Sequence, residues 1–116
     1  MKKVIIISIV FLQVNFALAQ LNMSLLGTLP YSGKGRASDI WGYVDENGNE
    51  YALVGMETGV SIVDVTNPAV PNEVFWAQGN IPTIWRDLKT WNDKVYITNE
   101  ASDGIMIIDL APLPGS

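Results

Sequence analysis

The sequence predicts an all-β protein, and three observations support this fold class. Segments rich in β-branched and aromatic residues, such as 50–56 and 94–100, have the composition of strands. Residues that favour tight turns separate these segments. The whole arrangement then occurs a second time along the chain, which predicts a fold built from a repeated strand unit.

The repeat has a period of 44 to 45 residues. Ile40-Trp41 aligns with Ile84-Trp85, and residues 51–54 align with 95–98, both at an offset of 44. One inserted residue then changes the offset to 45, which aligns Gly59 with Gly104 and Asp64 with Asp109. Because the matches fall in three separated segments, we interpret them as a true structural repeat.

Each copy predicts several strands. Residues 59–65 and 104–110 are nearly continuous apolar runs, so these strands are expected to be covered on both faces. A fourth strand is predicted at 72–79, and residues 23–31 resemble it. Residues 81–91 also have the apolar spacing of a helix, but we favour a strand because the parallel stretch of the first copy is short and contains glycine.

In each copy, one turn signal separates the first strand from the second. Asn47-Gly48 predicts a type I′ hairpin turn, in which both central residues need a positive φ. Asn92-Asp93 takes the equivalent place in the second copy. The residues 45, 47 and 49 also have the start of a calcium-loop spacing, but the glycine and the final glutamate of that loop are missing, so a hairpin is favoured.

Four-stranded units of this period, buried on both faces, predict β-propeller-type blades, with a solenoid of stacked sheets as the competing fold. We expect one complete blade at about residues 39–79, a partial blade at about 83–114, and a strand at 23–31 from the closing blade. A closed ring needs about four to eight blades. The chain is therefore expected to be the N-terminal part of a larger propeller; several copies in one ring are the alternative.

The first 19 residues predict a secretory signal peptide. Lys2 and Lys3 precede an apolar stretch at 4–12, and Ala17-Leu18-Ala19 fits a cleavage site. Nine apolar residues are too few to span a bilayer, which needs about 20. We therefore expect a secreted, extracellular or cell-surface protein with no membrane span after cleavage of residues 1–19.

The charge and the missing residue types narrow the function. Removing Lys2 and Lys3 from the seven basic residues leaves 5 Lys+Arg against 12 Asp+Glu, so nucleic acid is not an expected partner. The chain has no cysteine, so its stability must come from a hydrophobic core. It also has no histidine, which excludes histidine-dependent nucleophiles and histidine-ligated zinc from this segment.

Several motifs resemble one known family. The stretches DIWGYVDENGNEYALVG, GVSIVDVTNPAVP, IWRDLKTWNDKVYITNE and GIMIIDL resemble the LVIVD-repeat proteins, in particular the choice-of-anchor B family of secreted bacterial proteins. The resemblance covers residues 22–114. It implies an exported β-propeller and carries no established activity. It also implies a longer protein with several blades and a C-terminal anchor.

Three charged residues are candidate ligand contacts. Arg86 and Asp87 interrupt an apolar element near the start of a blade, where a propeller strand lines the central channel. Asp39 of the preceding blade, which aligns with Thr83, is expected to join them. The alternative is a structural ion pair or a turn-forming aspartate. The glycine-rich stretch 32–39 is interpreted as a flexible loop, with anion binding as the weaker alternative.

Other residues that recur in both copies are expected to be structural. Asp64 and Asp109 are predicted to accept backbone N–H groups in the following turn, since a reaction needs one special site and not one per blade. For the tryptophans we favour packing between blades over a carbohydrate-stacking surface. The remaining positions of this structural set are Trp41, Trp85, Gly59 and Gly104.

The sequence thus predicts a non-catalytic binding scaffold whose partner is an extracellular protein, a glycan or a surface component. No catalytic residue, metal ligand or cofactor is predicted. The alternative is a secreted hydrolase or lyase whose catalytic residues lie mostly in other blades.

Overall fold

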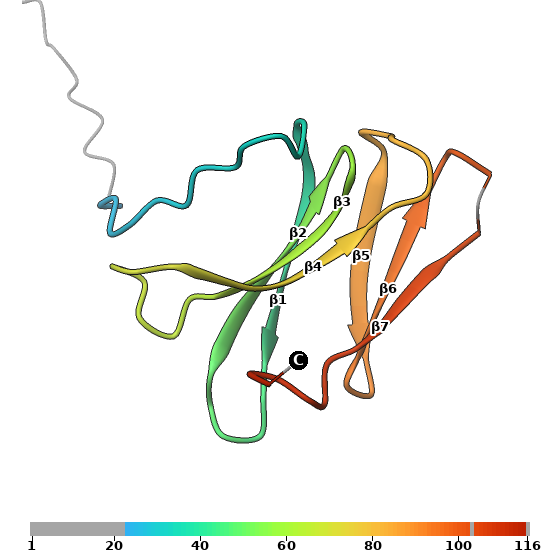
Figure 1. Cartoon of the computed structure of the whole chain (residues 1–116). Coiled ribbons are helices and arrows are strands. Elements are labelled where there is room, and N and C mark those ends of the chain that lie inside the picture. Colours follow the sequence, from blue (N-terminus) through green and yellow to red (C-terminus); the bar gives the residue numbers. More distant parts are fainter. Residues whose placement is uncertain (1–22, 103, 116) are drawn as a thin grey trace, which may run out of the picture.

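The computed structural model describes residues 23–102 and 104–115, and these residues form an all-β structure, as predicted. Four strands form the first antiparallel sheet and three form the second, each in sequence order (Figure 1). The strands are β1 (Ala37–Val44), β2 (Glu50–Met56), β3 (Gly59–Asp64), β4 (Asn72–Gln78), β5 (Arg86–Trp91), β6 (Lys94–Asn99) and β7 (Met106–Asp109). The predicted signal peptide, residues 1–19, lies outside the described residues. The part of the chain that the structure describes contains no helix long and apolar enough to cross a membrane.

The segment with the ambiguous spacing is a strand. β5 begins at Arg86, and along it Leu88 is buried while its neighbours Asp87 and Lys89 are exposed. This alternation has the period of two that a strand imposes on its side chains. The strand prediction for this part of residues 81–91 is therefore confirmed.

The two hairpin turns differ from the prediction. At the first turn φ is positive at Gly48 (85°) but not at Asn47, so a type I′ turn was the wrong prediction there. Gly48 N donates to Asp45 O, and Asp45 N donates to Asn49 O, both at 3.0 Å, which closes a three-residue loop that ends in glycine. The Asp45 carboxylate accepts further bonds from Asn47 N and Asn49 N at 2.9 Å each.

The type I′ turn occurs instead in the second copy. Asn92 and Asp93 have φ values of 50° and 56°, and they connect Trp91 to its cross-strand partner Lys94. The first hairpin is therefore longer than the second. This difference matters for how the two copies correspond.

The core lies between the two sheets. We call the face of the first sheet that contacts the second sheet its front face, and the opposite face its back face. Buried side chains meet there, four from the first sheet, three from the second and one just after β7. They are Tyr51, Leu53, Val60 and Ile62, and Leu88, Val95, Ile97 and Leu110.

The strand register shows which residues of the two sheets are equivalent, if the recurring aspartates Asp64 and Asp109 are taken as the reference pair. Asp64 pairs with Tyr51, whereas Asp109 pairs with Lys94. The bonds just beyond agree, since Val65 N donates to Glu50 O (2.9 Å) and Leu110 N donates to Asp93 O (2.8 Å). The second strands thus correspond at an offset of 43 and the third strands at 45.

The first strands correspond at a different offset. Tyr43 lies opposite Tyr51, and Trp91 lies opposite Lys94, so the offset in β1 and β5 is 48. Asp39 is therefore equivalent to Asp87. The alignment of Ile40-Trp41 with Ile84-Trp85 was wrong, because it assumed hairpins of equal length.

With this correspondence the sheets pack front to back. Tyr51 and Leu53 on the front face of the first sheet are equivalent to Lys94 and Tyr96. The buried residues of β6, however, are Val95 and Ile97, on the opposite face. The second sheet thus presents its back face to the first sheet and points its own front face away from it.

The segment before β1 lies on the back face of the first sheet. Residues 23–31, expected as a strand, form none among the described residues. The segment crosses the face of the sheet instead of extending its edge, and Gly27 lies against Pro68 and Pro71. The prediction that this stretch completes another blade remains a prediction.

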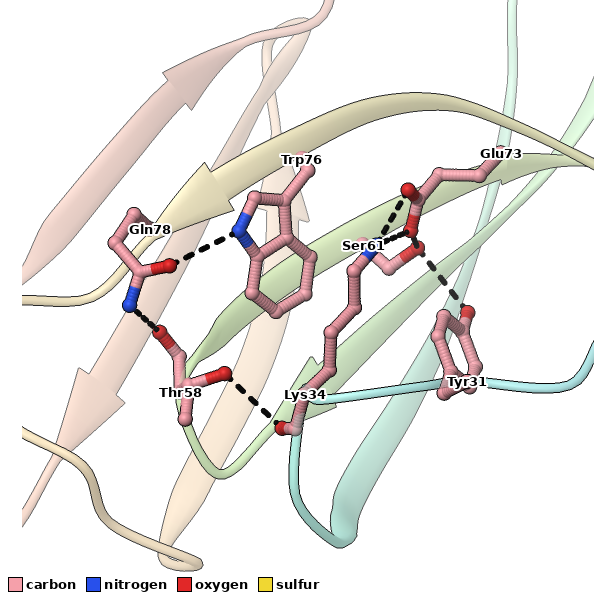
Figure 2. A network of polar contacts seen from close by, with 7 residues as sticks. All are labelled: Tyr31, Lys34, Thr58, Ser61, Glu73, Trp76 and Gln78. Carbon is pink, nitrogen blue, oxygen red and sulfur yellow. Dashed lines mark hydrogen bonds and ion pairs between the residues drawn. The ribbon is translucent and has the colours of Figure 1, made fainter.

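A polar network holds residues 31–34 on this face (Figure 2). The Tyr31 hydroxyl donates to Ser61 Oγ (3.1 Å), and Lys34 forms an ion pair with Glu73. Ser61 also donates to the Glu73 carboxylate and is fully buried. Lys34 Nζ lies 4.2 Å from the centre of the Trp76 ring, so one ammonium group contacts both a carboxylate and an aromatic face.

We predict that Glu73 makes the stability of this network pH-dependent. Burial raises the pKa of Glu73, but hydrogen bonds from Lys34 and Ser61 outweigh it and lower the pKa below its ordinary value of 4.5. A lowered folded-state pKa means that the stabilisation is present above the unfolded value and is lost as the pH falls through the folded value. Glu73→Gln should therefore cost about 1 kcal/mol at neutral pH and less in acid.

Urea unfolding between neutral and acidic pH measures this effect. The wild-type and Glu73→Gln free energies of unfolding should converge as the pH falls. Glu46→Gln, at the exposed tip of the first hairpin, is the matched control and should run parallel to wild type. Parallel profiles for Glu73→Gln as well would contradict the assigned role.

Candidate functional site

The edge strands β1 and β5 meet in a polar seam, which contains Asp39, one of the predicted ligand contacts. Asp39 Oδ2 accepts a hydrogen bond from Leu88 N (2.9 Å). Two positions later, Trp41 Nε1 donates to Thr90 Oγ1 (3.0 Å), and Tyr43 OH then donates to Asp93 Oδ1 (3.0 Å). Alternate residues of β1 share one face, so each of the three contacts the second sheet. Asp39 thus satisfies a backbone N–H on the edge of β5 that does not pair with β6.

Arg86 is a buried anchor and not an exposed ligand contact. Its residue is only 4% exposed, its Nε donates to Met56 O (2.9 Å), and its Nη2 donates to Ile81 O (3.1 Å). Gly79 leaves room for the guanidinium, because a Cβ there would lie 2.6 Å from Nη2. Arg86 therefore ties the connection between β4 and β5 to the first sheet.

Arg86 and Asp87 do not form an ion pair with each other. Adjacent residues of a strand point to opposite faces, so Asp87 lies on the exposed front face of β5. Its carboxylate pairs with Lys89 Nζ at 2.8 Å, and this hydrogen bond is the main cause that lowers the pKa of Asp87. Asp87 is therefore an ionised acceptor at neutral pH and is unsuited to donate a proton as a general acid.

The recurring aspartates make the turn bonds that the sequence predicts. Asp64 Oδ1 accepts from Thr66 N (2.9 Å), and Asp109 Oδ1 accepts from Ala111 N (3.2 Å). The two recurring glycines differ in role. A Cβ at Gly59 would lie 2.1 Å from Ala77 O, whereas Gly104 has open space around it and a φ of 84°.

A groove at one end of the sheets contains an accessible aromatic side chain, Trp85. Trp85 is 63% exposed and precedes β5, so it is not the counterpart of Trp41. Polar side chains from β1, β5 and the end of β6 surround it. The polar residues lining this Trp85 groove are Ser38, Arg86, Asp87, Thr98, Asn99 and Glu100.

The backbone that carries Trp85 is held in place. Thr83 N donates to Glu57 O (2.8 Å), and Trp85 N donates to Thr83 Oγ1 (3.2 Å). The Arg86 bond to Ile81 O fixes the same connection on its other side. Across the groove, Asn99 donates to Gly104 O and accepts from Ala101 N, which ties both of these residues to the end of β6. The backbone at Trp85 is thus fixed beside polar groups.

Sequence reasoning missed two sets of residues. The seam partner Thr90 was not singled out, and Asp93 was named only as a turn residue, although the alternation of 39, 41 and 43 is a signal of one polar and aromatic strand face. The network of Tyr31, Ser61 and Glu73 was also missed. A serine within the apolar run 59–65 was the available signal, since a buried hydroxyl needs a partner.

Metal and anion sites are not formed by the residues singled out for them. Within residues 23–102 and 104–115, no three carboxylates, or other ligand side chains, gather in a way that could hold a metal ion. In the glycine-rich stretch, Lys34 is already paired with Glu73. Comparison of the chain with protein-family models, curated proteins and solved structures finds no match.

Proposed function

We propose that the two sheets are successive blades of a β-propeller and that the protein is a secreted or cell-surface LVIVD-repeat protein. Its role is that of a non-catalytic binding scaffold. The front-to-back packing of equivalent sheets is the observation that carries the proposal. Two sheets of an ordinary sandwich share one core between their inner faces, whereas blades of a propeller each present the same face to the next blade.

The pair Ile40 and Leu88 illustrates this packing. The two residues are equivalent, yet Leu88 is fully buried against the first sheet and Ile40 is 64% exposed. Leu88 lies close to Gly55, where a Cβ would be 2.9 Å from Leu88 Cδ1. An apolar residue at this position is explained if each back face receives the front face of a neighbouring blade.

The Trp85 groove supports a glycan as the ligand. The exposed indole of Trp85 offers a flat apolar surface on which a sugar ring can stack, and Glu100 and Ser38 offer hydrogen-bonding groups for its hydroxyls. The carboxylate of Asp87 is paired with Lys89, and Asp39 is bonded to Leu88 N. These engagements favour binding over acid–base chemistry at the seam.

An array of immobilised neutral bacterial oligosaccharides tests this function. Wild type should be retained on at least one oligosaccharide, and calorimetry with that oligosaccharide should show about tenfold weaker binding for Trp85→Ala. Trp91→Ala, the other strongly exposed tryptophan, is the matched control and should bind like wild type. No retention on any oligosaccharide would overturn the glycan-binding proposal, and release of new reducing ends would support the hydrolase alternative.

A further inference from the structure

We propose that the back face of the first sheet carries a binding site for a primary alkylammonium group, and that Lys34 fills this site as an internal ligand. The site consists of Glu73, Ser61 and Trp76, and we call it the ammonium site. Residues 31–36, which carry Lys34 across it, are called the strap. The proposal is independent of the assignment of the two sheets as blades.

The three residues of the ammonium site share one face of neighbouring strands (Figure 2). Trp76 of β4 lies directly opposite Ser61 of β3, and Glu73 lies opposite Val63, two residues farther along β3. Residues two apart on a strand point to the same face, so the indole ring and the carboxylate flank one hydroxyl group. Ser61 is fully buried, so this hydroxyl needs its partners.

The first sheet orients the site without help from the strap. Ser61 Oγ donates to the Glu73 carboxylate. Trp76 Nε1 donates to Gln78 Oε1 (3.2 Å), and Gln78 Nε2 donates in turn to Thr58 O (2.7 Å), which fixes the plane of the indole (Figure 2). None of these bonds involves Lys34. The site should therefore keep its shape when the ammonium group leaves.

Lys34 makes the contacts that a bound ammonium ligand would make. Its Nζ pairs with the Glu73 carboxylate and lies 4.2 Å from the centre of the Trp76 ring. An ammonium group is attracted by both partners, most strongly where water is partly excluded. The side chains of Lys34 and Glu73 are 22% and 26% exposed, against 53% and 63% for the ion pair of Lys89 and Asp87. The ammonium site therefore shields its cation better than an ordinary surface pair does.

The strap is held by few contacts and can leave the sheet. No residue from 23 to 36 is buried. Lys34 O accepts from Thr58 N (3.3 Å) and from Thr58 Oγ1 (3.1 Å). Lys34 lies between Gly33 and Gly35, and both glycines have a positive φ. Segments without buried apolar contacts open at a low free-energy cost, so the site can open while the core between the sheets stays intact.

The site favours a primary ammonium group on an alkyl chain. Such a group offers three N–H donors around one compact charge, which suits a carboxylate beside an aromatic face. A lysine side chain of another polypeptide and a free polyamine share this chemistry. Because Lys34 is tethered, either ligand binds only the molecules in which the strap is open, and its apparent affinity falls in proportion to that fraction.

An NMR titration of the full chain with butylamine at neutral pH tests the site. Lys34→Ala empties the site, and this variant should bind butylamine with a dissociation constant of about 1–10 mM, read from the Trp76 indole N–H signal. Wild type should bind at least about tenfold more weakly, because Lys34 competes. Lys34→Met is the matched variant and should not bind, since its apolar chain fills the same space. Butan-1-ol, the neutral ligand of equal length, should not bind to any of them.

The carboxylate supplies the decisive comparison. The double variant Lys34→Ala/Glu73→Gln should bind butylamine at least about tenfold more weakly than Lys34→Ala. Lys94→Ala, at a lysine of the second sheet, is the control and should behave like wild type. Equal binding by the single and double variants, or no binding by a folded Lys34→Ala, would overturn the proposal.

Hydrogen exchange of the wild-type chain tests the opening of the strap without any substitution. Thr58 N donates to Lys34 O, so its amide should exchange faster in excess butylamine and at an unchanged rate in butan-1-ol. An unchanged rate in both would overturn the role of Lys34 as a displaceable ligand. Titration of Lys34→Ala with Nα-acetyl-lysine methylamide and with 1,4-diaminobutane then separates the two sources, because the tighter ligand identifies a polypeptide lysine or a polyamine.

Discussion

Replacing Leu88 by alanine is expected to lower the free energy of unfolding by about 3 kcal/mol. Leu88 is fully buried in the core between the sheets, and it fills the space left by Gly55. Truncation removes apolar contacts from both sheets at once and leaves a cavity that neither rigid sheet can close. Chemical denaturation at low protein concentration measures the loss.

Ile40→Ala provides the matched comparison. Ile40 is the equivalent residue of the first sheet but is 64% exposed, so its truncation should change the free energy of unfolding by less than about 0.5 kcal/mol. Equal losses for the two variants would show that packing between the two sheets does not contribute to the free energy of unfolding as predicted.

Replacing Gly59 by alanine should destabilise the protein by about 3 kcal/mol, a large effect for one added methyl group. The new Cβ would lie 2.1 Å from Ala77 O and 2.7 Å from the Trp76 ring. Gly59 pairs with Gln78, so the clash falls inside the ladder of β3 and β4 and cannot be relieved by a side-chain rotation. Thermal and urea unfolding should both show the loss.

Gly42→Ala is the control for this prediction. Gly42 lies in β1 of the same sheet and would place its Cβ in open space. Because alanine restricts the unfolded chain more than glycine does, this variant should be neutral or stabilised by about 0.5 kcal/mol. A Gly59→Ala variant as stable as Gly42→Ala would mean that β3 and β4 are farther apart than described.

The all-β class, the repeat and the positions of most strands could be predicted because they depend on local composition and turn chemistry. The correspondence between the copies could not. Ile40-Trp41 and Ile84-Trp85 look alike in sequence, but equivalence is set by pairing across the hairpins. Since side chains alternate with a period of two, an error of one residue in β2 exchanges the two faces of the sheet.

The candidate ligand contacts show the same limit. Arg86 and Asp87 look like one charged unit in the sequence, yet a strand separates them onto opposite faces. Only the structure shows that Arg86 holds the connection that carries Trp85. The acid of the first copy, Asp39, could be singled out by type, but its hydrogen-bond partner Leu88 N belongs to the backbone and carries no sequence signal.

Every strand pair in both sheets joins neighbours in sequence, and this has a consequence for the order of folding. Short loops close quickly and cost little chain entropy, so each sheet can form as successive hairpins. The back face of the second sheet, with Val95 and Ile97, packs into the core that it shares with the first sheet. During synthesis the N-terminal part of the chain leaves the ribosome first. The first sheet should therefore form before the second and then act as the template on which β5 to β7 fold.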